Sequence, residues 1–343
     1  MVKTKKKLMR ILSIDGGGIR GIIPGQILVI LEEKLKNASG NKDARIADHF
    51  DLIAGTSTGG ILACAYLCPE LSDPSLVLRP KFTAKEVVNL YLERGDRIFD
   101  TSLKHRIKTA GGILDEKYPE KELEKALDNY FGEIRLSQLL KPCLISSYDI
   151  KRREGHFFNQ LDAAKKEGED FFVKDVARAT SAAPTYFECS KIKSMTGINY
   201  PLIDGGVFVN NPALCAYAEV HNKFKFAARD MAILSLGTGY EDEAYNYFQA
   251  RNWGMVGWVK PVLNIMMSGV SEVVDYQLRQ IYSAVKAPSQ YLRINTGFPI
   301  NVNSEMDDAS QENMNALKEL GTETAQKFDA QLDSFVKFLI PSV

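Results

Sequence analysis

A serine at position 57 lies in a glycine-rich turn with the spacing of a nucleophile elbow. The pattern is GTSTG, with Ser57 at its centre, and it directly follows the apolar run 50–54. A sharp turn between a strand and a helix lifts a serine hydroxyl out of a sheet, where it can attack a substrate. Gly55 and Gly59 flank the serine because so tight a turn leaves no room for Cβ atoms. The pattern therefore predicts that Ser57 is a nucleophile.

An aspartate in a second glycine-rich turn, Asp204, is the candidate proton acceptor for that serine. It follows the run 200–203 and precedes Gly205 and Gly206. The usual acceptor is a histidine on a loop after a late strand. His221 is the only histidine after Asp204, and it lies inside the predicted helix 213–226. We therefore expect Asp204 to be the base, and burial would raise its pKa toward that task. A triad through His221 is the alternative.

Three consecutive glycines, Gly16, Gly17 and Gly18, lie between the predicted strand 9–14 and the predicted helix 22–36. Bare N–H groups at a helix N-terminus bind anions, and the helix dipole adds positive potential. The loop is suited to a phosphate, or to the oxyanion that forms when a serine attacks an ester. Arg20 is unfavourable beside a positive dipole end, which favours a functional role in holding the oxyanion or a phosphate headgroup.

The same glycines also fit the dinucleotide-binding pattern GxGxxG, through Gly16, Gly18 and Gly21. That pattern needs an acidic residue at the end of a second strand about 20 positions later. The region 37–48 is polar and loop-like, and no predicted strand precedes Asp43. Nucleotide binding is therefore the alternative interpretation of the loop.

The chain resembles the patatin-like acyl hydrolases. Three ordered blocks carry the resemblance: DGGGIRG at 15–21, GTSTGG at 55–60 and DGG at 204–206. The stretches 41–48, 235–239 and 305–310 also resemble the plant patatins, so the similarity extends from about residue 9 to about residue 315. The resemblance implies hydrolysis of lipid acyl esters by a dyad of Ser57 and Asp204, with the triple-glycine loop as the oxyanion hole.

Apolar runs alternate with amphipathic segments, which predicts an α/β fold. Continuous apolar strands such as 9–14 and 231–236 are typical of a mostly parallel sheet covered by helices on both faces. We therefore expect a three-layer αβα sandwich, as in the patatin-like proteins. No linker divides residues 1–343. The expectation is a single domain, with a core at about 9–240 and a helical extension at about 260–340 packed on it.

The composition is that of an ordinary globular protein. Apolar residues make up 45% and charged residues 25%, and the formal net charge is zero, so nothing indicates a nucleic-acid partner. The five cysteines form no CxxC or Cys/His cluster, so we expect neither a metal nor a cofactor. The basic start 1–7 lacks the apolar run of a signal peptide, and no stretch is long enough to span a membrane. A cytoplasmic enzyme with at most peripheral membrane contact is expected.

A segment rich in large apolar side chains begins at Trp253 and Trp258 and continues through 262–267. Such a segment either lines the core or the substrate pocket, or forms a surface where tryptophan meets lipid headgroups. The exposure of the two tryptophans distinguishes these interpretations.

Three functions are consistent with these patterns. The first is a lipid acyl hydrolase acting on phospholipids or glycolipids. The second is a nucleotide-binding or nucleotide-gated protein that uses the glycine loop. The third is a storage protein with weak esterase activity, because a fold does not dictate activity. The presence of both Ser57 and Asp204 favours the first.

Overall fold

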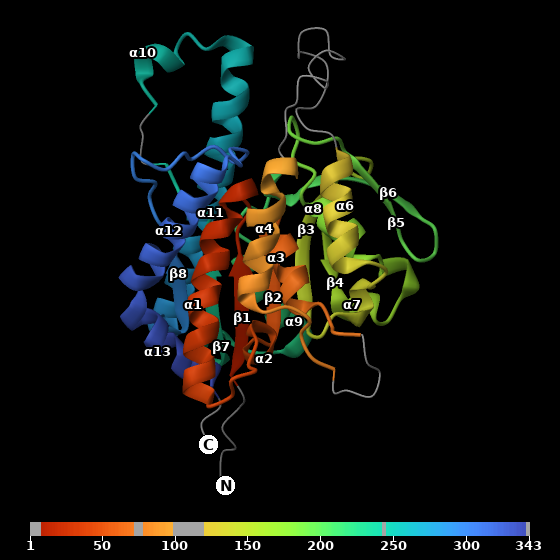
Figure 1. Cartoon of the computed structure of the whole chain (residues 1–343), viewed down its shortest axis with the longest axis vertical. Helices are drawn as coiled ribbons and strands as arrows, with labels where there is room; N and C mark the ends of the chain where they lie inside the picture. Colours follow the sequence, from red (N-terminus) through yellow and green to blue (C-terminus); the bar gives the residue numbers. More distant parts are fainter. Residues whose placement is uncertain (1–7, 72–77, 99–119, 242–244, 341–343) are drawn as a thin grey trace.

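A mixed sheet of eight strands forms the middle layer of the computed structural model, which describes residues 8–71, 78–98, 120–241 and 245–340 (Figure 1). Its order is β5-β6-β3-β2-β1-β7-β8, with β4 also paired to β3. Five neighbouring strands, β3, β2, β1, β7 and β8, run parallel to one another. Strands β4, β5 and β6 form antiparallel pairs. The strands are β1 (Met9–Ile14), β2 (Leu52–Thr56), β3 (Cys143–Asp149), β4 (Glu154–Asn159), β5 (Ser190–Lys193), β6 (Asn199–Asp204), β7 (Met231–Leu236) and β8 (Tyr291–Ile294).

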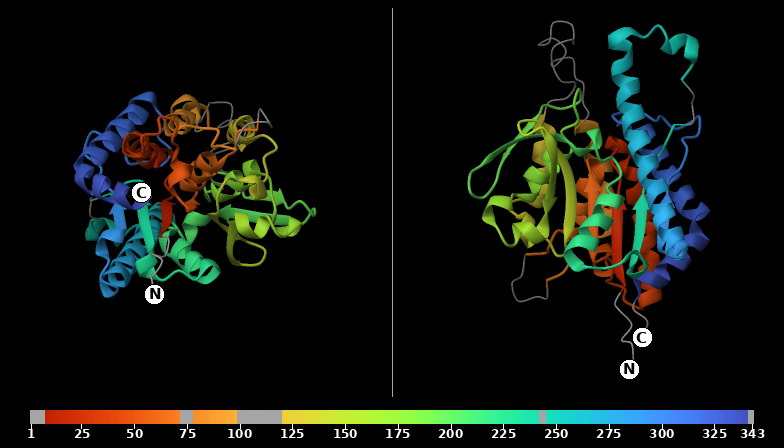
Figure 2. Two further views of the ribbon diagram at one scale, coloured as in Figure 1. Left: turned by 90° about the horizontal axis from the view of Figure 1, so that it is seen from below. Right: turned by 180° about the vertical axis from the view of Figure 1, so that it is seen from behind.

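Helices cover both faces of this sheet (Figure 2). The core on one face includes residues of α9 and α11, and the core on the other face includes residues of α1, α3, α4, α8 and α12. The described helices are α1 (Ile22–Ser39), α2 (Ile46–His49), α3 (Thr58–Leu67), α4 (Ala84–Ile98), α6 (Glu120–Phe131), α7 (Gln160–Ala163), α8 (Val173–Thr180), α9 (Ala213–Phe224), α10 (Tyr247–Ala250), α11 (Gly254–Ala284), α12 (Gln311–Lys327) and α13 (Asp329–Leu339).

Strand β1 shows why the chain forms three layers. Leu12 and Ile14 belong to the core beneath α1 and α3, whereas Met9 and Ile11 belong to the core beneath α9 and α11. Successive side chains of a strand point to opposite faces, so a strand that is apolar at every position needs cover on both. The predicted three-layer α/β fold is confirmed.

Strand β3 brings two strand ends together along one of its edges. Strand β4 occupies the other edge of β3 from residue 144 to 149. On the shared edge, β2 pairs with residues 143–146 and ends at Thr56, opposite Ser146. The antiparallel β6 pairs with residues 147–149 and ends at Asp204, opposite Ser147. These two strands therefore point toward each other, and Ser57 follows at the junction.

The C-terminal third differs from the expectation of helices alone. The end of the expected helical extension forms two helices, α12 and α13, which meet at Phe328. Strand β8 was not predicted, although it adds a parallel edge strand to the main sheet. It is only four residues long, which is too short for a pattern of alternation to appear in the sequence.

We expect Leu12→Ala to lower the free energy of unfolding by about 2–5 kcal/mol, because the side chain is fully buried and its removal leaves a cavity. Leu78→Ala is the matched control, since that side chain is 58% exposed, and its effect should be below about 0.5 kcal/mol. Urea denaturation followed by circular dichroism measures both. Equal effects would contradict the assignment of Leu12 to the core.

Candidate active site

Ser57 lies at the turn from β2 to α3 in a backbone conformation that few residues other than glycine adopt. Its φ is 55° and its ψ is −124°. Such strain persists only where the surrounding structure holds the backbone in place. Here the Ser57 N–H donates to Thr180 Oγ1 over 2.8 Å, and Thr180 Oγ1 donates to the carbonyl of Ser146 over 2.6 Å. The elbow is thus fixed to both α8 and β3.

The two glycines of the elbow are required by close packing. A Cβ atom on Gly55 would overlap the carbonyl of Gly59, and one on Gly59 would overlap the carbonyl of Ile14. In the second turn, a Cβ on Gly205 would overlap Ser146. Glycine at these positions lets the two turns approach the same strand ends.

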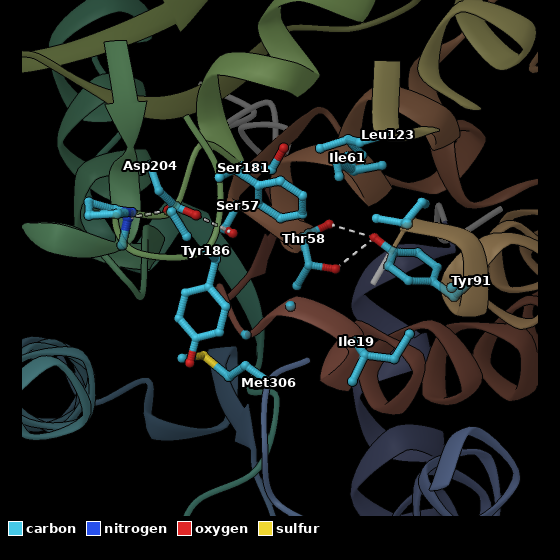
Figure 3. A pocket seen from close by; sticks show the side chains of 18 of the residues that line it. Ile19, Ser57, Thr58, Ile61, Tyr91, Leu123, Ser181, Tyr186, Asp204 and Met306 are labelled. Carbon is cyan, nitrogen blue, oxygen red and sulfur yellow. Dashed lines mark hydrogen bonds between the residues drawn. The ribbon is translucent and has the colours of Figure 1, made fainter. Parts of the chain in front are cut away.

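The hydroxyl of Ser57 donates a hydrogen bond to Asp204 Oδ2 over 2.5 Å (Figure 3). The other carboxylate oxygen, Oδ1, accepts the Gly206 N–H over 2.7 Å. Both side chains are buried. Burial raises the pKa of Asp204 to about 7, although the hydrogen bonds from Ser57 and Gly206 oppose this shift. A carboxylate with such a pKa is suited to accept a proton near neutral pH.

The glycine loop follows β1 and lies beside Ser57. Gly17 and Gly18 line the same pocket as the serine. The Gly16 N–H is already used, because it donates to the carbonyl of Asn210 over 3.1 Å. In contrast, the N–H groups of Gly17 and Gly18 donate to no acceptor within the described residues. The predicted anion site therefore has two available backbone donors, the N–H groups of Gly17 and Gly18, instead of the three that the sequence indicates.

Arg20 supports this loop from outside the pocket. Its Nε donates to the carbonyl of Gly17 and its Nη1 to the carbonyl of Ser304, each over 3.3 Å. The guanidinium lies 5.6 Å from the ring centre of Phe298. Arg20 is not among the residues that line the pocket. The expectation that it holds the oxyanion directly is therefore corrected, because its hydrogen bonds brace the loop instead.

A buried ion pair fixes the residue that precedes the loop. Arg293 of β8 donates to both carboxylate oxygens of Asp15, over 2.9 and 2.6 Å, and to Ser235 Oγ over 2.9 Å. The Asp15 N–H donates to the carbonyl of Leu236. Sequence patterns give no signal for this contact, because Asp15 and Arg293 are 278 residues apart in the chain.

An apolar pocket extends from Ser57 between α4, α6 and α11 (Figure 3). Its polar wall atoms include those of Thr58 and Tyr91, which satisfy each other: Thr58 Oγ1 donates to the Tyr91 hydroxyl over 2.6 Å, and Tyr91 donates to the Thr58 carbonyl over 3.1 Å. Such a wall suits a hydrocarbon chain. The apolar lining residues from the helices are Ile61, Leu90, Ile98, Leu123, Ala126, Leu127, Leu263, Met266 and Met267.

The histidines of the described residues lie away from this pocket. His221 is on α9, where its Nδ1 bonds to the carbonyl of Phe226 and its ring stacks on Tyr217. His49 and His156 are packed elsewhere and do not line the pocket, and His105 lies outside the described residues. The described residues also contain no group of three or more potential metal ligands.

Comparison with known proteins shows the family of the chain. The family model for patatin-like phospholipases matches residues 12–217. The chain belongs to the patatin-like phospholipase family. It is 35% identical to Patatin-2-Kuras 3 of Solanum tuberosum, covering 94% of this chain and 85% of that protein. It is 34% identical to Patatin-like protein 2 of Arabidopsis thaliana, covering 94% and 84%.

A solved structure also overlaps with the chain, but at a TM-score of only 0.36. It is VipD from Legionella pneumophila, with 12% identity over 92% of this chain and 67% of that one. So low a score supports no argument. Membership of the patatin-like phospholipase family supports lipid acyl hydrolase activity and lipid substrates.

We expect kcat/KM to rise with pH and to reach half of its maximum near pH 7, because Asp204 accepts a proton only when ionised and its pKa is raised to about 7. An aspartate with an ordinary pKa near 3.9 would give a flat profile above about pH 5. Hydrolysis of a short-chain p-nitrophenyl ester between about pH 5 and pH 9 measures this, with circular dichroism to check that the protein stays folded. A flat profile would contradict the assignment of Asp204 as the base.

Proposed function

We propose that the chain is a serine ester hydrolase of the phospholipase A type, which cleaves fatty-acyl esters of phospholipids or related glycerolipids. The observation that carries the proposal is the Ser57 hydroxyl, 2.5 Å from a buried carboxylate at one end of an apolar pocket. Nucleophile, base and acyl-binding wall then belong to one site. Since its substrates are lipids, peripheral contact with a membrane is part of this proposal.

The first half of the reaction forms an acyl-enzyme. Asp204 accepts the Ser57 proton as Oγ attacks the ester carbonyl carbon. The carbonyl oxygen becomes an oxyanion, which the N–H groups of Gly17 and Gly18 stabilise as donors that are already in place. When the intermediate collapses, the bond to the alcohol oxygen breaks. Protonated Asp204 gives its proton to that oxygen, and the lysolipid leaves.

The second half repeats these roles with water. Asp204 accepts a proton from a water molecule as the water oxygen attacks the carbonyl carbon of the acyl-enzyme. The oxyanion forms in the same place, and its collapse returns the proton to Ser57 Oγ and releases the fatty acid. The apolar pocket holds the acyl chain through both halves, so the reacting carbonyl stays beside Ser57. These steps use no metal and no cofactor.

Ser57→Ala and Asp204→Asn should each reduce ester hydrolysis by several orders of magnitude, and by similar factors, because residues that act as one unit are not additive. His221→Ala is the control and should keep most of the rate, since His221 lies on α9 away from the pocket. A fluorophosphonate probe should label Ser57, as mapped by mass spectrometry, and should not label Ser57→Ala. If His221→Ala is as damaging as Asp204→Asn in a folded protein, a triad is the better mechanism.

Gly18→Ala should lower kcat by about 10²–10³, because it displaces one oxyanion donor, a loss of about 2.7–4 kcal/mol in the transition state. A Cβ at this position would overlap the carbonyl of Met306, and the φ of Gly18 is +58°. Gly40→Ala is the matched control, because Gly40 also has a positive φ, +69°, but has open space around it. A similar loss of kcat in both variants would mean that backbone strain alone explains the effect.

The nucleotide-binding and storage alternatives have different signatures. Calorimetry with NAD and ATP tests the first: micromolar binding of either, together with no hydrolysis of any fatty-acyl ester, would replace the hydrolase proposal. A storage protein would show the Ser57–Asp204 contact but only slow turnover on phospholipid and glycolipid alike. Both assays use the unmodified chain.

A further inference from the structure

We propose that α10 and the beginning of α11 dock this protein on the surface of a phospholipid bilayer. We call residues 245–258 the tip. The tip projects beyond the sheet at the end opposite to the chain termini (Figures 1 and 2). The inference rests on the proposed function, because a hydrolase whose substrates are membrane lipids has to reach them at the bilayer.

The tip exposes an unusual concentration of large apolar side chains. Met255 is 91% exposed, Phe248 is 72%, Tyr247 is 71% and Trp258 is 40%. Isolated exposed apolar residues are ordinary, but a group of them on one projecting element marks a surface that contacts a partner. Tryptophan, tyrosine and phenylalanine are also the side chains that favour the boundary between headgroups and acyl chains.

The exposed apolar surface continues from the tip to the pocket. Val262, Ile265 and Met266 of α11 are about two-fifths exposed, at 39, 44 and 45%. Met266 and its neighbours Leu263 and Met267 also line the pocket that contains Ser57. One helix thus connects the tip with the pocket wall. This arrangement favours a lipid surface as the partner, because an acyl chain drawn from it would meet the apolar side chains of Val262, Ile265 and Met266 on its way to the pocket.

The rest of α11 holds the tip in position. Val274, Leu278 and Tyr282 are buried in the core beneath the sheet. A helix of 31 residues is about 46 Å long, so the helix can be anchored at one end and project at the other. Among the described helices, none combines the length and the apolar content needed to cross a bilayer. Contact with the surface is therefore the form of docking that this helix supports.

The charged side chains in residues 245–271, which include the tip, also favour contact with phospholipid. Between residues 245 and 271, the only charged residues are Arg251 and Lys260, and both are cationic. Basic residues beside an apolar anchor are attracted to the phosphates of anionic lipids. A second copy of the chain would bring a segment with the same positive charge, so the charge favours lipid over self-association.

The two tryptophans of the chain give a direct probe of this contact. Trp253 and Trp258 are the only two, and their ring centres lie 4.9 Å apart in the tip. Vesicles of phosphatidylcholine and phosphatidylglycerol are added to Ser57→Ala, which should leave the lipid intact. We expect the tryptophan emission to shift to shorter wavelength and to be quenched by bromine-labelled acyl chains. Unchanged emission at saturating lipid would overturn the proposal.

Paired variants test which residues make the contact. In vesicle co-sedimentation, Phe248→Asp combined with Met255→Asp should weaken binding by about tenfold or more, because two apolar side chains lose their burial. Tyr276→Asp is the matched control: Tyr276 is 65% exposed on the same helix, but lies about 32 Å from Met255 along its axis. Equal binding by the tip variant and the control would overturn the proposal.

Further measurements distinguish docking on a bilayer from the proposed hydrolase function and from self-association. Neither variant should change hydrolysis of a monomeric short-chain ester in solution, because neither changes a residue that lines the pocket. If the wild type hydrolyses no ester but still binds vesicles through the tip, the proposed function fails and the docking surface stands. If sedimentation equilibrium shows a dimer that only the tip variant breaks, while vesicle binding is unchanged, the tip is an interface between two copies.

Discussion

The site depends on one feature of the sheet, the edge of β3 that β2 and β6 share. Because the two strands approach from opposite directions, the residue after Thr56 and the last residue of β6 meet at one level. Hydrogen bonds stabilise the junction: Thr56 Oγ1 and Ser146 Oγ are 2.6 Å apart, and Ser147 Oγ donates to the carbonyl of Ile203 over 2.7 Å. The separation of Ser57 and Asp204 is thus set by strand register, and a slip of one residue would turn the side chains to the wrong face.

A second constraint comes from β7 and β8, which lie on the opposite side of β1 from β2. Asp15 connects the end of β1 to β7 through its backbone and to Arg293 of β8 through its carboxylate. Buried ion pairs often add little net stability, because both charges lose their hydration. A role in positioning explains this one better, since it lies directly before Gly16 and fixes where the glycine loop begins. The loop and the elbow are therefore held by different strands and meet at the pocket.

The sequence predicted the parts of the site that depend on local backbone geometry. The turns around Ser57 and Asp204 and the glycine loop are recognisable because glycine and strand patterns lie next to each other in the chain. The contacts of Thr180, Arg293 and Tyr91 join residues that are far apart, so no local pattern could predict them. In the segment that begins at Trp253, Leu263, Met266 and Met267 line the pocket, as one of the two interpretations expects. Trp258 is exposed but Trp253 is only half-buried, so contact of both tryptophans with lipid headgroups stays a prediction.

Asp204 also couples the chemistry of the site to the folding of the chain. Its pKa is raised to about 7 in the folded protein, whereas an unfolded chain would have the ordinary value near 3.9. Between these values folding takes up a proton, so this carboxyl favours the folded state at acidic pH and loses that contribution as pH rises through about 7. As the proposed base, Asp204 is ionised in the pH range where its contribution to folding is least favourable. Under the proposed mechanism, the apolar layers around β1 offset this cost of keeping an ionisable carboxyl buried.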